Sequence, residues 1–131
     1  MTLPSKFDED FGLEVVDPSQ LLDEVPFKKD IRLAQTYIAG TMFVEDIEDK
    51  LGSVTYGTDL ELRRDPSNPY DRNAIEVLNC DGNRIGFLPR KINPIAAGLM
   101  DSGKHLYCRV TCMVFDMDYT GVDVDIMMED L

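Results

Sequence analysis

The sequence is poor in the residues that enzymes most often use as catalytic or metal-binding groups. It contains one histidine, His105, and three cysteines, and it has no Gly-x-Ser-x-Gly turn. A hydrolase triad therefore has little support. Cys108 and Cys112 stand near His105, but no fourth ligand follows at a standard zinc spacing. We predict that the protein is not an enzyme and that it holds no metal and no cofactor.

A long apolar run and a secretory leader are also missing. No run approaches the roughly 18 residues that a membrane span requires, and the acidic start, 1–10, lacks the apolar centre of a signal peptide. The odd number of cysteines favours reduced thiols over a disulfide framework. We predict a cytoplasmic protein that does not act at a membrane.

Positive charge is scarce, since 13 lysines and arginines stand against 25 aspartates and glutamates, which gives a net charge of −12. The deficit lies in 1–57 and 116–131, whereas 58–115 is close to neutral. A broad phosphate-binding surface is disfavoured, because its affinity grows with the number of cations that contact phosphates. A small pocket with a few well-placed cations is compatible with this distribution.

The 131 residues suffice for one domain with a substantial core. Alternation of apolar and polar residues predicts six short strands, over 36–44, 58–62, 74–78, 84–88, 106–114 and 122–126. Gly40 interrupts the first of them, which suggests a bulge or a close approach of backbone or ligand. Short strands at this spacing are typical of a small barrel or sandwich.

The connections carry turn and helix signals. Turns are predicted at 79–83, where Asp-Gly favours a hairpin, and at 118–121. Helical signals occur at Asp17-Pro18, over 45–51 and from Asn93 to Met100. Asn93, followed by a proline, is predicted to be the N-cap of the last helix.

The last two predicted strands each have one apolar face. In 106–114 this face consists of Leu106, Cys108, Val110, Cys112 and Val114. Cys108 and Cys112 are therefore predicted to be buried thiols that pack as small hydrophobic groups. In 122–126 the aspartates are predicted to point outward.

The stretch 63–75, which reads Arg-Arg-Asp-Pro-Ser-Asn-Pro-Tyr-Asp-Arg-Asn-Ala-Ile, connects two of the predicted strands. Its prolines fix two φ angles and push the preceding residues to extended backbone. Its asparagines and aspartates can bond to nearby main-chain N–H groups. Two readings remain open: a rigid corner that satisfies its own polar groups, or a stiff loop that presents Tyr70 and Asp71 to a ligand.

Three segments together resemble the HIRAN domain: Thr-Tyr-Ile-Ala-Gly-Thr-Met-Phe at 36–43, the run from Gly57 through Asp-Pro-Ser-Asn-Pro-Tyr-Asp-Arg-Asn-Ala-Ile to Val77, and Gly-Asn-Arg-Ile-Gly-Phe-Leu-Pro-Arg at 82–90. The resemblance covers about 34–126. It implies a mainly β fold, a small OB-like β-barrel of about six strands with one or two short helices. Residues 1–33 would be an acidic N-terminal extension and 127–131 an acidic C-terminal tail.

The best understood members of this family bind single-stranded DNA at its free 3′-hydroxyl end. The resemblance implies that Tyr70 stacks on the terminal base and that Asp71 accepts a hydrogen bond from the hydroxyl. Phe43 falls where the family offers a second aromatic ring, and Arg90 falls where a basic residue meets the phosphate, with Lys91 beside it. Met42 and Phe87 stand where such members have arginine and histidine. Arg63, Arg64 and Arg72 flank the loop and are candidate replacements for the missing cation. Arg63 and Arg64 point to opposite faces if the strand continues, so at most one of these two would help, and Arg64 is the one predicted to belong to the site.

The resemblance implies a module that captures a single-stranded DNA 3′ end during DNA repair or the processing of stalled replication forks, with a helicase or nuclease as partner. The alternative hypothesis is a protein-interaction or regulatory module with a vestigial pocket. In that case the acidic ends, together with the apolar residues of 1–30, would dock a partner protein.

Overall fold

The computed structural model describes residues 29–116 and 119–129. The described elements, in chain order, are β1 (Ile31–Tyr37), the 3-10 helix η1 (Thr41–Phe43), α3 (Ile47–Lys50), β2 (Asp59–Arg64), β3 (Ile75–Leu78), β4 (Arg84–Phe87), α4 (Asn93–Asp101), β5 (Leu106–Asp116) and β6 (Tyr119–Met128). The helix signal at Asp17-Pro18 lies outside the described residues.

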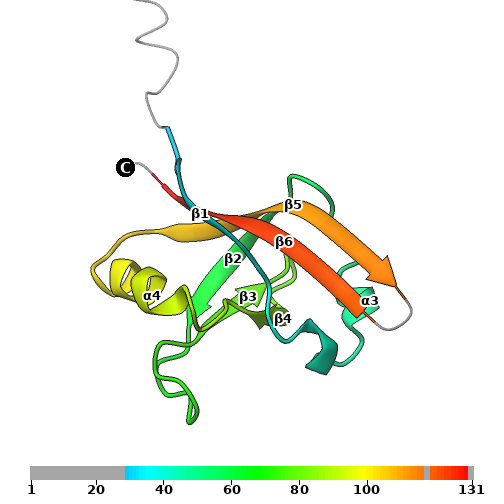
Figure 1. Ribbon diagram of the computed structural model, residues 1–131, viewed down its shortest axis with the longest axis horizontal. Coiled ribbons are helices and arrows are strands. Elements are labelled where there is room, and N and C mark those ends of the chain that lie inside the picture. The colour runs from blue at the N-terminus through cyan, green and yellow to red at the C-terminus, as the bar shows by residue number, and fades with distance from the viewer. Residues whose placement is uncertain (1–28, 117–118, 130–131) are drawn as a thin grey trace, which may run out of the picture.

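The six strands form one antiparallel sheet in the order β1-β6-β5-β2-β3-β4. The sheet curls until its two edges meet (Figure 1). Ala39, just after β1, exchanges two main-chain hydrogen bonds with Phe87 of β4, at 2.7 and 2.9 Å. The predicted small OB-like barrel, mainly β with few helices, is therefore confirmed.

Gly86 makes this meeting of the edges possible. A Cβ atom at this position would lie 2.4 Å from Cγ2 of Ile38 and 2.6 Å from the carbonyl oxygen of Ala39. Only a residue without a side chain lets the two backbones approach this closely. The edge contact next to the candidate site thus depends on one glycine.

The interior of the barrel is filled by one cluster of apolar side chains, most of them aliphatic. The most deeply buried are contributed by all strands except β1, and include Leu60, Ile75, Val77, Ile85, Leu106, Val110, Val122, Val124 and Ile126. Ala96 and Ala97 of α4 pack against the same cluster. α4 therefore lies against the barrel (Figure 1). This packing fixes the position of the first turn of α4, which faces the loop between β2 and β3.

The first predicted strand, 36–44, is wrong beyond Tyr37, and it misses the start of β1 at Ile31. β1 ends at Tyr37 and Gly40 has φ 77°, a left-handed backbone that extended structure does not use. η1 follows at once, so Phe43 lies on a helical turn. The predicted interruption at Gly40 is present, but the strand does not resume after it as it would after a bulge.

Cys112 is exposed, not buried as predicted. The register between β5 and β6 shifts between Val110 and Cys112. A bulge adds one residue and reverses the alternation beyond it. Cys108 is fully buried before the bulge, where burial raises its pKa to about 12. Met113 packs toward the core beyond it.

The predicted turn at 118–121 is too long, because Tyr119 already pairs with Asp116 and β6 continues through Gly121. The hairpin at 79–83 is confirmed, with Gly82 at φ 83°. The predicted domain limits, 34 and 126, stay a prediction. The outer strands reach beyond both, since β1 begins at Ile31 and β6 ends at Met128. Among the described residues, no helix has both the length and the hydropathy needed to cross a membrane.

Candidate nucleic-acid interface

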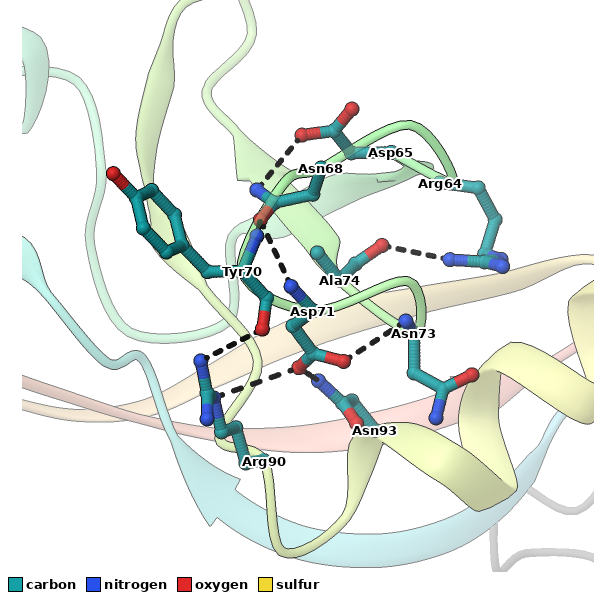
Figure 2. A network of polar contacts seen from close by, with 9 residues as sticks. All are labelled: Arg64, Asp65, Asn68, Tyr70, Asp71, Asn73, Ala74, Arg90 and Asn93. Atoms are coloured by element: carbon teal, nitrogen blue, oxygen red, sulfur yellow. Dashed lines mark hydrogen bonds and ion pairs between the residues drawn. The ribbon is translucent and has the colours of Figure 1, made fainter.

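The loop between β2 and β3, 65–74, is held together by its own polar side chains (Figure 2). Oδ1 of Asn68 accepts hydrogen bonds from the main-chain N–H groups of Tyr70 and Asp71, at 2.8 and 3.1 Å. Nδ2 of Asn68 donates to Asp65 at 3.1 Å. The loop backbone is therefore fixed from within, and the Tyr70 side chain extends outward with 83% of its surface exposed.

Asp71 is anchored through both carboxylate oxygens. Oδ1 accepts a hydrogen bond from the N–H of Asn73 at 2.9 Å, and Oδ2 accepts one from Nδ2 of Asn93 at 2.8 Å. Arg90 adds an ion pair, with Nε 3.7 Å from Oδ2. The Asn93 hydrogen bond, followed by that of Asn73, lowers the pKa of Asp71 below its ordinary value. Asp71 is thus a carboxylate at neutral pH.

Arg90 connects the loop to the segment between β4 and α4. Its Nη2 donates a hydrogen bond to the carbonyl oxygen of Tyr70 at 3.2 Å. The side chain is 73% exposed. Because the contacts described for Arg90 use Nε and Nη2, other N–H donors of the guanidinium remain for a ligand.

These side chains border one cavity of about 260 Å³. Its lining consists of Ala39, Gly40, Asn68, Tyr70, Asp71, Ala74, Phe87, Leu88, Arg90 and Asn93. An aromatic ring, a carboxylate and a guanidinium therefore meet at one concave surface. The structure brings together three of the six predicted site residues: Tyr70, Asp71 and Arg90.

Phe43 and Lys91 do not line this cavity. Phe43 lies on η1 and is 86% exposed, and its N–H donates to the carbonyl of Gly40, which does line the cavity. Lys91 follows Arg90 and is exposed. Both side chains are free of the core.

Arg64 lies on the other side of the loop. Its guanidinium binds Asp101 of α4 at 2.9 and 3.3 Å and donates to the carbonyl oxygens of Ala74 and Arg72, at 2.8 and 3.1 Å. Arg64 lowers the pKa of Asp101 through these hydrogen bonds. Only 16% of its side chain is exposed. In this arrangement Arg64 ties the loop to α4.

A family model of the HIRAN domain matches residues 31–128, which is most of the chain. The chain belongs to the HIRAN domain family. It is 43% identical over 51 residues to the Helicase-like transcription factor of Mus musculus and 37% identical over 67 residues to the Fanconi-associated nuclease 1 homolog of Arabidopsis thaliana. The matches cover 39% and 51% of this chain, but only 5% and 7% of those two proteins.

Solved structures agree with this membership. A crystal structure of a protein from Lactobacillus plantarum matches with a TM-score of 0.72 and 29% identity, covering 79% of this chain and 99% of that one. The crystal structure of the HIRAN domain of human HLTF matches with a TM-score of 0.59 and 24% identity, covering 73% and 74%. The second likeness shows a common fold.

The sequence did not identify Asn93 as a site residue of this HIRAN domain. Asn93 is only 2% exposed, its side chain reaches Asp71, and the N-cap of α4 is Ile92, without a side-chain cap hydrogen bond. The N-cap prediction is therefore wrong. Asn-Pro at a helix start is typical of capping, and only the tertiary contact with the loop between β2 and β3 distinguishes the two roles.

No group of His, Cys, Asp or Glu in 29–116 and 119–129 is arranged to hold a metal ion. A second cavity, of about 330 Å³, is lined by Asp30, Asp59, Leu60, Glu61, His105, Tyr107, Arg109 and Glu129. Four carboxylates in this lining disfavour an anionic ligand. The HIRAN cavity beside Tyr70 is the better candidate for a nucleic-acid end.

Proposed function

We propose that this HIRAN domain binds the free 3′-hydroxyl end of single-stranded DNA in the cavity bordered by Tyr70, Asp71 and Arg90. The observation that carries the proposal is the convergence of these three side chains in a member of the family. Each group matches one part of a strand end: a base, a hydroxyl and a phosphate.

Tyr70 provides the surface for the terminal base. Its ring is 83% exposed, so stacking on it requires no rearrangement of the core. A base stacked on an aromatic ring contributes about 1–3 kcal/mol without sequence preference. Phe43, which is also exposed, is proposed to cover the other face of the base.

Asp71 reads the chemical state of the end. Each carboxylate oxygen has two lone pairs, and the hydrogen bonds from Asn73 and Asn93 leave acceptor capacity for a hydroxyl donor. A terminal phosphate would bring two or more negative oxygens against this carboxylate and would be repelled. The domain should therefore prefer 3′-hydroxyl over 3′-phosphate ends.

Arg90 is proposed to contact the phosphate that precedes the terminal nucleoside, with Lys91 nearby. Arg64 is held by Asp101 and by loop carbonyls, so its proposed contribution is to keep the loop in place. With few cations involved, the affinity should fall only slightly with salt.

We further propose that the domain is a binding module without catalytic activity of its own, acting in the cytoplasm. The relatives that share this segment are a helicase-like protein and a nuclease homolog. This favours a role beside a helicase or nuclease partner, in DNA repair or in the processing of stalled replication forks.

The direct test titrates the protein with one oligonucleotide sequence that ends in a 3′-hydroxyl, in a 3′-phosphate, or in a 3′-hydroxyl at a duplex end. Tighter binding of the single-stranded 3′-hydroxyl form supports the proposal. Equal binding of the hydroxyl and phosphate forms, or no binding, contradicts it and leaves partner docking through the acidic ends as the alternative.

A further inference from the structure

A row of directly paired residues crosses β2, β3 and β4 and ends at the candidate cavity. Arg63 pairs with Glu76, Glu76 pairs with Phe87, and Phe87 pairs with Ala39. Residues directly opposite each other in a sheet project to the same face. Phe87 and Ala39 line the cavity, so this face of the sheet leads from the cavity to Arg63.

Arg84 joins this row because of an irregularity in β4. The register shifts between Val77, which pairs with Gly86, and Leu78, which pairs with Arg84. The extra residue lets Arg84 and Phe87, three positions apart, share one face. The Arg84 guanidinium lies 5.0 Å from the centroid of the Phe87 ring. A cation is therefore held against a residue that lines the cavity.

The cluster formed by Arg63, Glu76 and Arg84 carries a net positive charge. Glu76 is buried, with 9% exposure, and accepts both arginines: Arg63 Nη2 lies 2.7 Å and Arg84 Nη1 3.4 Å from its carboxylate. Two cations thus share one anion. Arg63 and Arg84 keep 56% and 50% of their side chains exposed, so N–H donors of both remain accessible from solvent.

We propose that the cluster of Arg63, Glu76 and Arg84 is a subsite for a backbone phosphate of the DNA strand whose end occupies the cavity. The inference rests on the proposed function. Glu76 fixes the two guanidinium groups in place, so little side-chain entropy is lost when they bind a phosphate. Arg84 is the nearer of the two to the cavity, because it contacts the Phe87 ring.

The subsite is short. Arg63 lies two strand spacings of about 4.8 Å from Phe87, or roughly 10 Å along the row. Two residues before Arg63, Glu61 lines the acidic cavity, where a phosphate is disfavoured. The cluster therefore takes one or two phosphates that precede the one at Arg90, and a dinucleotide is too short to use it fully.

The test compares Arg84→Gln and Arg63→Gln with Arg32→Gln as control. Arg32, on β1, is 62% exposed and forms an ion pair with Asp125 on β6. Its substitution changes the net charge of the protein by the same amount as the other two, but at a place away from the row. Affinities for a 3′-hydroxyl hexanucleotide and a 3′-hydroxyl dinucleotide are measured over a series of salt concentrations. Arg84→Lys keeps the positive charge, so it shows whether a cation at this position is enough to restore the salt dependence of the affinity.

For the hexanucleotide, losing one phosphate contact should reduce the slope of log K against log salt by about 0.7. Arg84→Gln should show this reduction, Arg84→Lys should largely restore it, and Arg32→Gln should keep the wild-type slope. The dinucleotide should respond less to Arg84→Gln. In the wild-type protein, the Arg84 Nε–H and Phe87 ring resonances should shift with the hexanucleotide more than with the dinucleotide, which is a readout independent of variant folding.

An Arg84→Gln slope equal to that of Arg32→Gln, or resonances that do not respond to the hexanucleotide, overturns the subsite. If hydroxyl and phosphate ends bind equally while the slope still depends on Arg84, the end-recognition proposal fails and the phosphate subsite stands. If the protein distinguishes hydroxyl from phosphate ends while Arg84→Gln does not change the salt slope, the end-recognition proposal stands and the phosphate subsite fails. Absence of any binding overturns both.

Discussion

Asn93, at the start of α4, donates a 2.8 Å hydrogen bond from Nδ2 to Oδ2 of Asp71, in the loop between β2 and β3. The two residues are 22 positions apart, and Asn93 is almost completely buried. Because α4 packs on the core through Ala96 and Ala97, the position of the carboxylate is set by the barrel and not by the loop alone. The carboxylate that we propose as the recognition group is thereby held in one orientation before any ligand arrives.

Asn93→Ala should raise the pKa of Asp71, because the hydrogen bond that lowers it most is lost. In the wild-type folded protein the Asp71 carboxylate is ionised down to a lower pH than in the unfolded chain. Its ionised form therefore stabilises the fold above the pKa of an unfolded aspartate, and this stabilisation is lost as the pH falls through the lower pKa of the folded state. The carboxylate that we propose to accept the 3′-hydroxyl is protonated over the same fall in pH. In the variant, binding of a 3′-hydroxyl end should therefore begin to fail at a higher pH on acidification. Binding measured between neutral and acidic pH checks this shift.

Asn73→Ala is the matched control for this variant. Asn73 contacts Asp71 through its main-chain N–H, which alanine retains. The control should keep the wild-type pH profile, whereas Asn93→Ala should also lose folding stability, since it removes a part-buried hydrogen bond to a charged group. If the pH dependence of binding were the same for Asn93→Ala and Asn73→Ala, Asn93 would not be the group that lowers the pKa of Asp71.

Substitution of Tyr70 should separate binding from folding. Its side chain is 83% exposed, so Tyr70→Ala should leave thermal unfolding within about 0.5 kcal/mol of the wild-type stability. The same change should weaken binding of a single-stranded end by about 1–3 kcal/mol, because one stacking surface is lost. Tyr70→Phe keeps the ring and should bind nearly as the wild type does. Equal loss for both variants would argue against stacking.

Gly86→Ala should destabilise the barrel where its edges meet. The added methyl would lie 2.4 Å from Ile38 and 2.6 Å from the Ala39 carbonyl, and the backbone carbonyl cannot rotate away as a side chain would. Overpacking of this kind costs typically about 1–3 kcal/mol. Urea unfolding measures the loss.

Gly98→Ala serves as the comparison for that variant. Gly98 lies in α4, where an added Cβ meets nothing within 4 Å. Alanine is the better helix former by about 0.8–1.0 kcal/mol, so this variant should be more stable than the wild type. If both variants changed stability in the same direction, the close approach at Gly86 would not be the cause.

Five of the six strands, β2 to β6, could be predicted from the sequence because the local pattern of apolar residues marks each of them. The predictions failed where a bulge or a glycine with positive φ interrupted the alternation of apolar and polar residues. The bulge after Val110 reversed the faces of β5 and exposed Cys112, and nothing in the strand's own pattern marks it. Gly40 was recognised as an interruption, but a positive φ that ends a strand and a bulge that continues it require the same residue type.

The site could be predicted only in part for a similar reason. Tyr70 and Asp71 could be proposed because they lie in one contiguous motif, and Arg90 because it ends a second motif; the structure places all three at one cavity. Asn93 depends on how α4 packs against the loop, which is a tertiary relationship. Arg64 shows the converse: its position beside the loop suggested a ligand contact, and its partners proved to be Asp101 and two carbonyl groups.

The central claim is that Asp71 accepts a hydrogen bond from the 3′-hydroxyl. The most direct measurement is a cycle of four affinities, for the wild-type protein and Asp71→Ala, which removes both acceptor oxygens, each with an oligonucleotide that ends in a 3′-hydroxyl or in a 3′-deoxy sugar. A hydrogen bond to a charged group predicts a coupling of about 1.5–3 kcal/mol between the two changes, with the wild type alone preferring the hydroxyl. A coupling near zero, with both proteins treating the two ends alike, would contradict the account.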